Sequence, residues 1–168
     1  MKTSAELYKE FEAATNAYLD IVGALSQEEL NTVPFTGSWT AAQVTEHLCK
    51  SDNGMIQALN GPVYPTNRQP DEMVGNLRTI FLDFSTKLPS PGFIIPSEGT
   101  HDKDDLLSFF KAGREQIDKA IKTLDLTATL HVPIFGEPTR LELIAFVIFH
   151  TQRHTNQVKH ISEKLVGV

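Results

Sequence analysis

Long segments in which apolar residues recur at alternating steps of three and four dominate this chain. They cover residues 7–25, 40–60, 73–88, 106–124 and 139–165. This spacing places the apolar side chains on one stripe of an α-helix, so each segment predicts a helix that turns this stripe toward a core. Sustained period-two alternation, the pattern of a half-buried strand, is missing, although a short strand pair around residues 130–135 is conceivable. The sequence therefore predicts an all-α fold.

Helix start signals mark three of these boundaries. In a capping box, a Ser or Thr side chain accepts a hydrogen bond from the backbone three residues later, and a Glu or Gln at that position returns one. Three pairs match this pattern: Thr3 with Glu6, Thr40 with Gln43, and Thr139 with Glu142. Between the predicted helices, stretches rich in Pro and Gly, such as "NGPVYPTNRQP" and "LPSPGFIIPSEG", predict turns and irregular connections.

The lengths of the connections limit how the helices can be arranged. A moderate link joins the first two long helices, whereas roughly forty residues, including the shorter helix over 73–88, separate the second long helix from the next. That length is ample for a crossover between parallel neighbours. We therefore predict a four-helix bundle that is up-down-down-up, with an additional short helix in the long crossover, as a single domain over residues 1–168.

The composition argues against several classes of protein. The chain has 168 residues and a formal net charge of -6. Its Lys and Arg residues are scattered, so no basic stripe is present to neutralise the phosphates of a nucleic acid. The N-terminal residues lack the apolar region of a signal peptide, and the longest apolar run, "LIAFVIF", is much shorter than a membrane span. We expect a cytoplasmic protein with no nucleic-acid or membrane partner. The single cysteine, Cys49, excludes an intramolecular disulfide.

Two histidines interrupt the apolar stripe of the last predicted helix. His150 and His154 lie four residues apart, so their side chains leave the same helix face about one turn from each other. This spacing suits joint ligation of one metal ion. Leu143, Val147 and Ile161 continue the same stripe, which places both imidazoles on the side that faces the bundle interior. Burial favours the neutral imidazole, and this is the form that offers a ring nitrogen to a metal.

One of the other four histidines also lies on a predicted core stripe. His47 sits among apolar residues on the inward side of the second long helix, so we predict it as the third ligand. His160 is six residues beyond His154 and about a hundred degrees away from the ligand face. His101 and His131 fall in connecting segments, where a solvated role or a role in a turn is the default.

Three imidazoles from two helices predict an open metal site. A structural zinc site is usually closed by four protein ligands, so three would leave a position for water or substrate. Imidazole ligands favour zinc, nickel, copper or iron over magnesium or calcium, and the residues do not choose among the first four. We expect a divalent transition metal, zinc or nickel first, with iron, copper or manganese as alternatives. Gln157, three residues after His154, could hydrogen-bond a ligand ring or a bound water. "HTQRH" is not the zincin motif, because Thr151 replaces the catalytic Glu, so peptide hydrolysis is disfavoured.

For the other reactive residues near these histidines, we predict structural rather than catalytic roles. Cys49 is two residues from the nearest predicted ligand and on a different helix face, which favours a partly buried structural thiol over a nucleophile. Glu46 and Asp52 could approach the edge of the site, although charged residues on a helix are usually solvated. Trp39 is expected to anchor the start of its helix by packing, and Arg153 is expected at the surface.

Two stretches together resemble the DinB/YfiT-like family. They are "GSWTAAQVTEHL" at 37–48 and "HTQRHTNQV" at 150–158: a Trp before a helix that carries one His, and later His-x-x-x-His followed by Gln. The resemblance covers essentially the whole chain in length and helix order. It implies an up-down-down-up four-helix bundle, a divalent metal held by three histidines, and a homodimer. Carried over residue by residue, the ligands are His47, His150 and His154.

The resemblance also implies a class of reaction. Relatives in this family include transferases that use a low-molecular-weight thiol such as bacillithiol, and mycothiol-dependent isomerases, whereas others are called hydrolases. The leading expectation is a metal-dependent transferase that activates such a thiol for attack on a small electrophile. A hydrolase with metal-bound water, and a non-catalytic metal-binding bundle related to stress, are the alternatives. A bundle whose histidines only pack in the core, without metal, also remains open.

Overall fold

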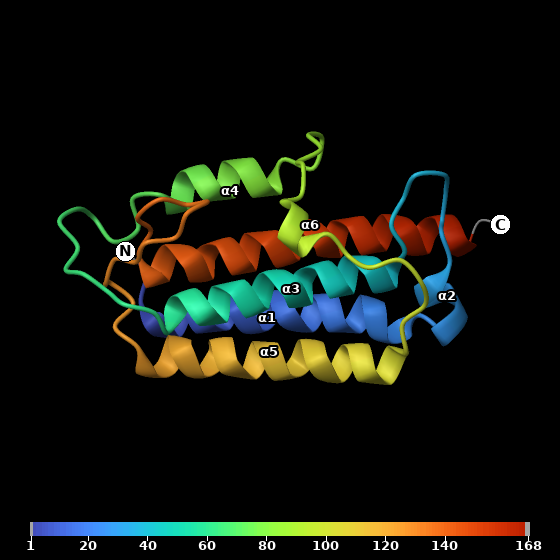
Figure 1. The fold of residues 1–168 in the computed structure, drawn as a ribbon, viewed down its shortest axis with the longest axis horizontal. Helices are drawn as coiled ribbons and strands as arrows, with labels where there is room; N and C mark the ends of the chain where they lie inside the picture. Colours follow the sequence, from blue (N-terminus) through green and yellow to red (C-terminus); the bar gives the residue numbers. More distant parts are fainter. Residues whose placement is uncertain (1, 167–168) are drawn as a thin grey trace.

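The computed structural model describes residues 2–166, and four long helices form its main body. They are α1 (Ser4–Ala24), α3 (Ala41–Leu59), α5 (Lys103–Thr123) and α6 (Arg140–Val166), which Figure 1 shows as one bundle. No strand is assigned between residues 2 and 166. The strand pair considered around 130–135 is reduced to isolated bridges, in which Thr129 pairs with Tyr64 and Thr139, and Val132 pairs with Gly136.

Each long helix packs against two others. α1 lies beside α6 and α5, and α3 lies beside α5 and α6. In Figure 1, α1 and α6 run in one direction along the bundle, and α3 and α5 run in the opposite direction. The predicted up-down-down-up four-helix bundle is therefore confirmed, since the second and third long helices are parallel neighbours. Such neighbours need a long crossover, which residues 60–102 supply.

All three predicted capping boxes are formed. In each, the Thr hydroxyl accepts a hydrogen bond from the backbone three residues later, and the Glu or Gln side chain there accepts one from the Thr backbone. A fourth box, Ser26 with Glu29, starts the short helix α2 (Gln27–Asn31) in the first link. The apolar pattern did not predict α2, because five residues are too few to display a stripe.

The helix predicted over residues 73–88 is shorter in the structure. α4 (Val74–Leu82) packs on α6 and ends where Asp83 begins a turn. The Asp83 carboxylate accepts hydrogen bonds from the backbone N–H of Ser85 at 3.0 Å and from the hydroxyls of Ser85 and Thr86 at 2.5 and 2.6 Å. These local bonds offer the backbone an alternative to the helix, so the helix stops although apolar residues continue in the sequence.

The core surrounds the first half of α6. Every residue from Leu141 to Phe149 is buried, because α1, α3 and α4 all pack on this helix. Glu142 is also buried, but its carboxylate accepts hydrogen bonds from the Arg68 guanidinium at 2.6 and 2.7 Å and from the backbone N–H of Met73 at 2.7 Å. These charge-assisted bonds tie the crossover to the start of α6. Within the described chain, no helix is long and apolar enough to cross a membrane.

Candidate metal centre

Three imidazoles meet between α3 and α6. His47 lies in the first half of α3 and His150 and His154 on α6, and the packing of these two helices brings them together. Nε2 of His150 is 3.1 Å from Nε2 of His47 and 3.0 Å from Nε2 of His154. The three residues are 2%, 6% and 7% exposed in chain order. The structure thus gathers the three predicted ligands at one buried point.

The other ring nitrogen of each imidazole faces a polar partner. His47 Nδ1 donates to the backbone carbonyl of Ile94 at 2.9 Å, and His154 Nδ1 donates to Oε1 of Gln157 at 2.7 Å. His150 Nδ1 lies 3.4 Å from the Ser51 hydroxyl. Because carbonyl oxygens only accept, His47 and His154 carry their hydrogen on Nδ1 and keep a lone pair on Nε2. Bonds of this kind orient the rings of metal-ligating histidines.

Burial keeps all three imidazoles neutral. Loss of solvation lowers the pKa of His47, and it lowers the pKa of His150 well below its ordinary value. The same cause lowers the pKa of His154 to about 3. The proximity of the three rings acts in the same direction on His150 and His154, since a charge on one ring disfavours a charge on the next. Near neutral pH, the cluster therefore presents lone pairs rather than imidazolium protons.

The donor set fits a borderline divalent metal. With lone pairs on Nε2 of His47 and His154, the Nε2 of His150 could donate to only one of them, which leaves at least one pair of acceptors facing each other. One cation among the three nitrogens would satisfy all of them. Nitrogens at about 2.0–2.1 Å from a tetrahedral zinc lie about 3.3 Å apart, close to the separations of 3.0 and 3.1 Å observed here.

Aromatic rings enclose the imidazoles. Phe146 stacks on His150, with ring centroids 5.0 Å apart and planes inclined by 19°. Phe81 meets the same imidazole edge-on at 5.9 Å. Trp39, expected as a packing anchor, lies with its ring centroid 5.2 Å from that of His47. These rings hold the imidazoles in place and surround them with apolar surface, which strengthens electrostatic interactions at the nitrogens.

The two carboxylates expected near the edge of the site are engaged elsewhere. Glu46 accepts hydrogen bonds from the backbone N–H and hydroxyl of Ser97 and pairs with Lys50 at 3.0 Å. Partial burial acts to raise the pKa of Glu46, but these bonds hold it at about 2. Asp52 pairs with the buried Arg114, whose Nε is 3.0 Å from Oδ2. Burial raises the pKa of Asp52 to about 6 in spite of that partner. Neither carboxylate belongs to the imidazole cluster.

The remaining candidates lie outside the cluster. Cys49 is buried on another face of α3, and burial raises the pKa of its thiol to about 12, so it stays protonated. Arg153, expected at the surface, is partly buried and donates to the carbonyls of Phe81 and Asp83 at 3.3 and 2.8 Å and to that of Thr86. His131 and His160 are exposed, while His101 pairs with Glu46 at 3.0 Å.

Sequence reasoning missed two partners of the cluster. Ser51 lies four residues after His47 on α3, so helix periodicity could have placed its hydroxyl near the site. Ile94 contributes only its backbone carbonyl, which every residue has, so no residue type could have indicated it. Its position, 47 residues from His47 in an irregular connection, also removed any periodic signal.

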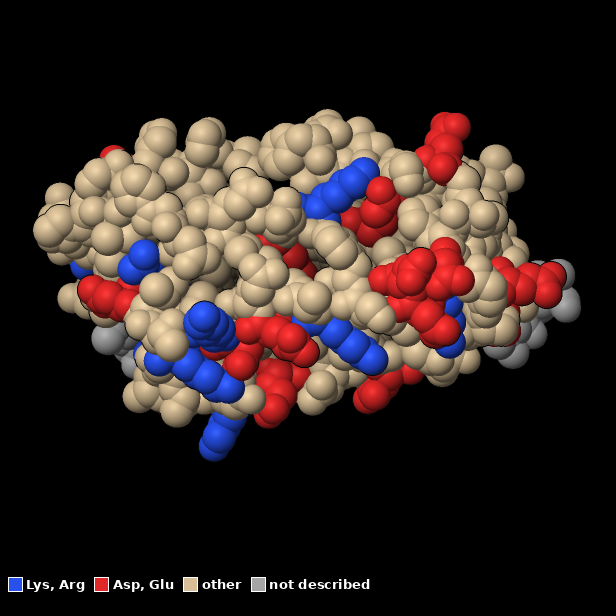
Figure 2. Space-filling view, turned by 60° about the horizontal axis from the view of Figure 1, so that its bottom comes forward, with Lys and Arg blue, Asp and Glu red and all other residues tan. Residues whose placement is uncertain are grey.

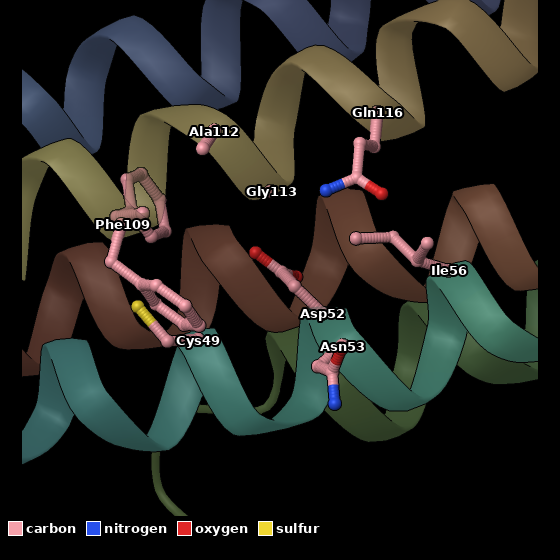
Figure 3. Close-up of a pocket in the computed structure, with 9 residues that line it drawn as sticks. Cys49, Asp52, Asn53, Ile56, Phe109, Ala112, Gly113 and Gln116 are labelled. Atoms are coloured by element: carbon pink, nitrogen blue, oxygen red, sulfur yellow. The ribbon is translucent and has the colours of Figure 1, made fainter.

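Two hollows lie along the seam between α3 and α5. Figure 3 shows the inner one, of about 110 Å³, in which Asp52 from α3 and Gln116 from α5 point into the space between the two helices, near Gly113. An outer hollow of about 500 Å³ shares Cys49 and Phe109 with it. Because an α-helix has about 3.6 residues per turn, Cys49 and Asp52 point away from the side of α3 that carries His47. These hollows therefore do not open onto the imidazoles.

The charged surface carries both signs. Figure 2 shows the face on which α5 comes forward, where Lys and Arg side chains are interspersed with Asp and Glu. The first turn of α5 carries Asp104 and Asp105, and its last turn carries Lys122, an order that matches the dipole of the helix. On this face the basic side chains do not form one continuous patch.

Comparison with known proteins finds a matching family model, a related sequence and two solved structures with a similar fold. Residues 10–158 match the model of the DinB superfamily. The uncharacterized protein YuaE of Bacillus subtilis (strain 168) is 28% identical over an alignment of 162 residues, and the match covers 92% of this chain and 95% of YuaE. Among solved structures, TT2238, a four-helix bundle protein, is 19% identical with a TM-score of 0.61, over 94% of this chain and 99% of its own. YfiT from Bacillus subtilis, with an unusual four-helix bundle topology, is 16% identical with a TM-score of 0.61, over 96% of this chain and 87% of its own.

Proposed function

This chain belongs to the DinB superfamily, and on that premise we propose that it is a metal-dependent enzyme in which His47, His150 and His154 hold one divalent ion. The observation that carries the proposal is the convergence of the three Nε2 atoms, at separations of 3.0 and 3.1 Å, with each Nδ1 turned to a polar partner. Zinc or nickel is the proposed ion, and iron, copper or manganese are the alternatives.

The residues around the cluster have defined tasks in this proposal. The carbonyl of Ile94 and the amide oxygen of Gln157 fix the tautomers of His47 and His154, so their Nε2 lone pairs face inward. Burial keeps the imidazoles neutral, as ligation requires. The ring of Phe146, which stacks on His150, limits both the access of water to this imidazole and the rotation of its ring. The donor set is therefore preorganised.

The reaction we propose is attack by the sulfur of a low-molecular-weight thiol on an electrophilic carbon of a small molecule. An S–C bond forms, the bond from that carbon to its leaving group breaks, the leaving group departs as an anion such as halide, and the thiol proton passes to solvent. When bound, the ion would supply Lewis acidity that lowers the pKa of a thiol at its open position. Within the described residues, no carboxylate joins the three imidazoles. A thiol that is acidified in this way needs no protein base in order to attack, so the composition of the cluster supports this reaction.

Hydrolysis is the second candidate, and one comparison favours it. YfiT, whose fold resembles this one, is described as a probable metal-dependent hydrolase. A water nucleophile gains from a nearby general base, and the two carboxylates expected near the site, Glu46 and Asp52, are bonded to Ser97 and Arg114. A hydrolase would therefore have to rely on the acidity that the ion alone confers on water.

The first test is the metal content of protein purified without a His tag, for wild type, His47→Ala and the control His160→Ala. One ion per chain that is lost only in His47→Ala supports the site. No bound metal in the wild type after reconstitution with zinc or nickel contradicts it.

The second test measures activity. Metal-loaded protein is assayed with small thiols and a chromogenic aryl halide, and separately with an ester. Product that requires both thiol and metal supports transfer, whereas ester cleavage without thiol supports hydrolysis. Metal binding with neither activity would indicate a binding protein.

A further inference from the structure

A short segment of the crossover covers the imidazoles. We call residues 91–97 the strap; it includes η1 (Gly92–Ile94), which packs on α3. Figure 1 shows this yellow-green segment crossing the middle of the bundle, where α3 and α6 lie. Only Ile94 and Pro96 of the strap are buried. Because the Ile94 carbonyl bonds directly to His47, the strap is part of what encloses the cluster.

The strap is fastened to the bundle by side chains rather than by backbone pairing. The backbone N–H groups of Ile94 and Ile95 donate to Pro91 and Gly92, inside the strap itself. Between residues 84 and 101, no backbone hydrogen bond described in the structure reaches the backbone of another element. Segments with few buried apolar residues and few such bonds open at low free-energy cost, while the surrounding helices stay folded.

One stripe of α3 provides most of these fastenings. Gln43 donates to the Ser97 carbonyl at 3.1 Å, Lys50 donates to the Ile95 carbonyl at 2.8 Å, and Glu46 accepts from the backbone N–H and hydroxyl of Ser97 at 2.7 and 2.9 Å. Glu46 is central, because it also pairs with Lys50 and His101, each at 3.0 Å. Removing its carboxylate would loosen several contacts at once.

The two ends of the surrounding loop are also held by hydrogen bonds to side chains of the bundle. Arg153 binds the carbonyls of Asp83 and Thr86 on the α4 side. On the other side, the backbone of His101 exchanges hydrogen bonds of 2.7 and 2.9 Å with the Asn31 side chain. Between Ser97 and His101, Gly99 has a φ of +109°, a conformation that residues with a Cβ rarely adopt. The strap therefore lies between two anchored ends of the loop.

We propose that the strap is a gate over the three imidazoles and that Glu46 is the latch that keeps it closed. Since the cluster residues are 2%, 6% and 7% exposed, a small molecule can reach their Nε2 atoms only after a covering element moves. The strap is a covering segment that side chains, rather than backbone pairing, hold on the bundle, and only two of its residues are buried. Glu46 is thus a positioning residue: it does not touch the ring nitrogens but controls, through Ser97, whether they are accessible.

Metal and gate would then be coupled through His47. Its Nε2 faces the cluster, and its Nδ1 bonds to the strap. A cation on Nε2 makes the Nδ1–H a stronger donor, so ligation would tighten the bond to Ile94 and favour the closed strap. This coupling, unlike the gate itself, rests on the proposed function.

Access to the imidazoles can be measured without metal by their reaction with diethyl pyrocarbonate, read by mass spectrometry of peptides. His131 and His160 are exposed and provide the internal reference. In wild type we expect the three clustered histidines to react far more slowly than this reference. In Glu46→Ala their rate should rise by at least about tenfold, because that is roughly the factor for loss of one hydrogen bond to a charged group and Glu46 accepts two from Ser97. Glu46→Gln, which keeps an acceptor for Ser97, should show a smaller rise.

The matched control is Glu115→Ala, an exposed glutamate on α5. It should leave all rates unchanged, and circular dichroism together with urea midpoints should show that every variant stays folded. Equal protection of the cluster in wild type and Glu46→Ala would overturn the latch. Rapid reaction of the cluster in wild type would overturn the gate.

A second arm uses zinc alone. In wild type, zinc should slow hydrogen exchange at the Ser97 amide. The Glu46→Ala variant should bind zinc faster than the control Glu115→Ala, and it should also release zinc to a chelator faster. If no variant binds zinc, the proposed function fails while the modification rates still decide the gate. If zinc binds but exchange at Ser97 does not change, the coupling through His47 is overturned.

Discussion

His47 and His150 place their Nε2 atoms 3.1 Å apart, although 103 residues separate them in the chain. Each ring also turns its Nδ1 toward a partner outside the cluster, Ile94 for His47 and Ser51 for His150. Two neutral imidazoles that meet in this way share one proton or one cation. Substitutions at and around this contact should therefore change the metal affinity, the free energy of unfolding and the dependence of that free energy on pH.

Replacing any one of the three histidines with Ala should abolish stoichiometric metal binding. Each imidazole supplies one of only three protein ligands, so its loss should weaken affinity by more than the roughly 10–100-fold that loss of an outer partner causes. The helical content should be retained, because the core does not depend on these rings. Zinc titration by calorimetry with circular dichroism checks both statements. His160→Ala, an exposed histidine on the same helix, should bind like wild type.

Gln157→Leu should lower zinc affinity by about 10–100-fold, the usual cost of losing a partner that orients a ligand. Its Oε1 accepts from His154 Nδ1 at 2.7 Å, so without it the ring can rotate or change tautomer. The neighbouring Asn156 is exposed, and Asn156→Leu serves as the matched control in the same titration. An unchanged affinity in Gln157→Leu would mean that packing alone orients His154.

Without metal, the free energy of unfolding should fall as the pH is lowered from 6.5 toward about 3. These are the ordinary and the folded pKa of His154, and the pKa values of His47 and His150 are lowered in the same direction. In that window the unfolded chain binds more protons than the folded one, which costs up to about 1.4 kcal/mol per pH unit for each such group.

Urea unfolding in a chelator, at several pH values within that window, measures this dependence. His154→Leu removes one of the titrating groups, so its unfolding free energy should depend less steeply on pH than that of wild type. The same slope in both proteins would show that other groups, such as carboxylates, account for the loss of stability in acid.

Arg114→Met should destabilise the fold by about 3–5 kcal/mol near neutral pH, because it leaves the buried Asp52 carboxylate without its partner. Arg114 also donates to Thr151 at 2.9 Å, which links α5 to α6 beside His150. The pKa of Asp52 is already raised to about 6, so protonation at lower pH should relieve part of the loss. Urea unfolding at two pH values tests this.

A double variant separates the charge from the packing. Arg114→Met combined with Asp52→Leu removes both charges, and it should be more stable than Arg114→Met alone near neutral pH. If the double variant is less stable than the single one, the loss comes from packing around Arg114, whose guanidinium also lies 4.5 Å from the centroid of the Phe110 ring.

Much of the helical framework could be predicted because the signals are local. The boxes that begin with Thr3, Thr40 and Thr139 are each formed, since a cap depends only on residues three apart. The end of α4 was predicted six residues too late, at 88 rather than Leu82. There the Asp83 turn, another local interaction, outweighed the apolar pattern.

The sequence by itself determined which faces of the helices are buried, and therefore which histidines could meet: His47, His150 and His154 lie on core stripes, whereas His160 does not. Only the tertiary structure decided how the three rings are oriented and covered. The path of the crossover places Ser97 beside Glu46 and the Ile94 carbonyl beside His47. The sequence of this crossover has no helical or strand periodicity that could have predicted these contacts. A backbone carbonyl carries no residue-specific signal, and a contact across an irregular loop depends on the path of the whole chain, so these contacts follow from the packed fold alone.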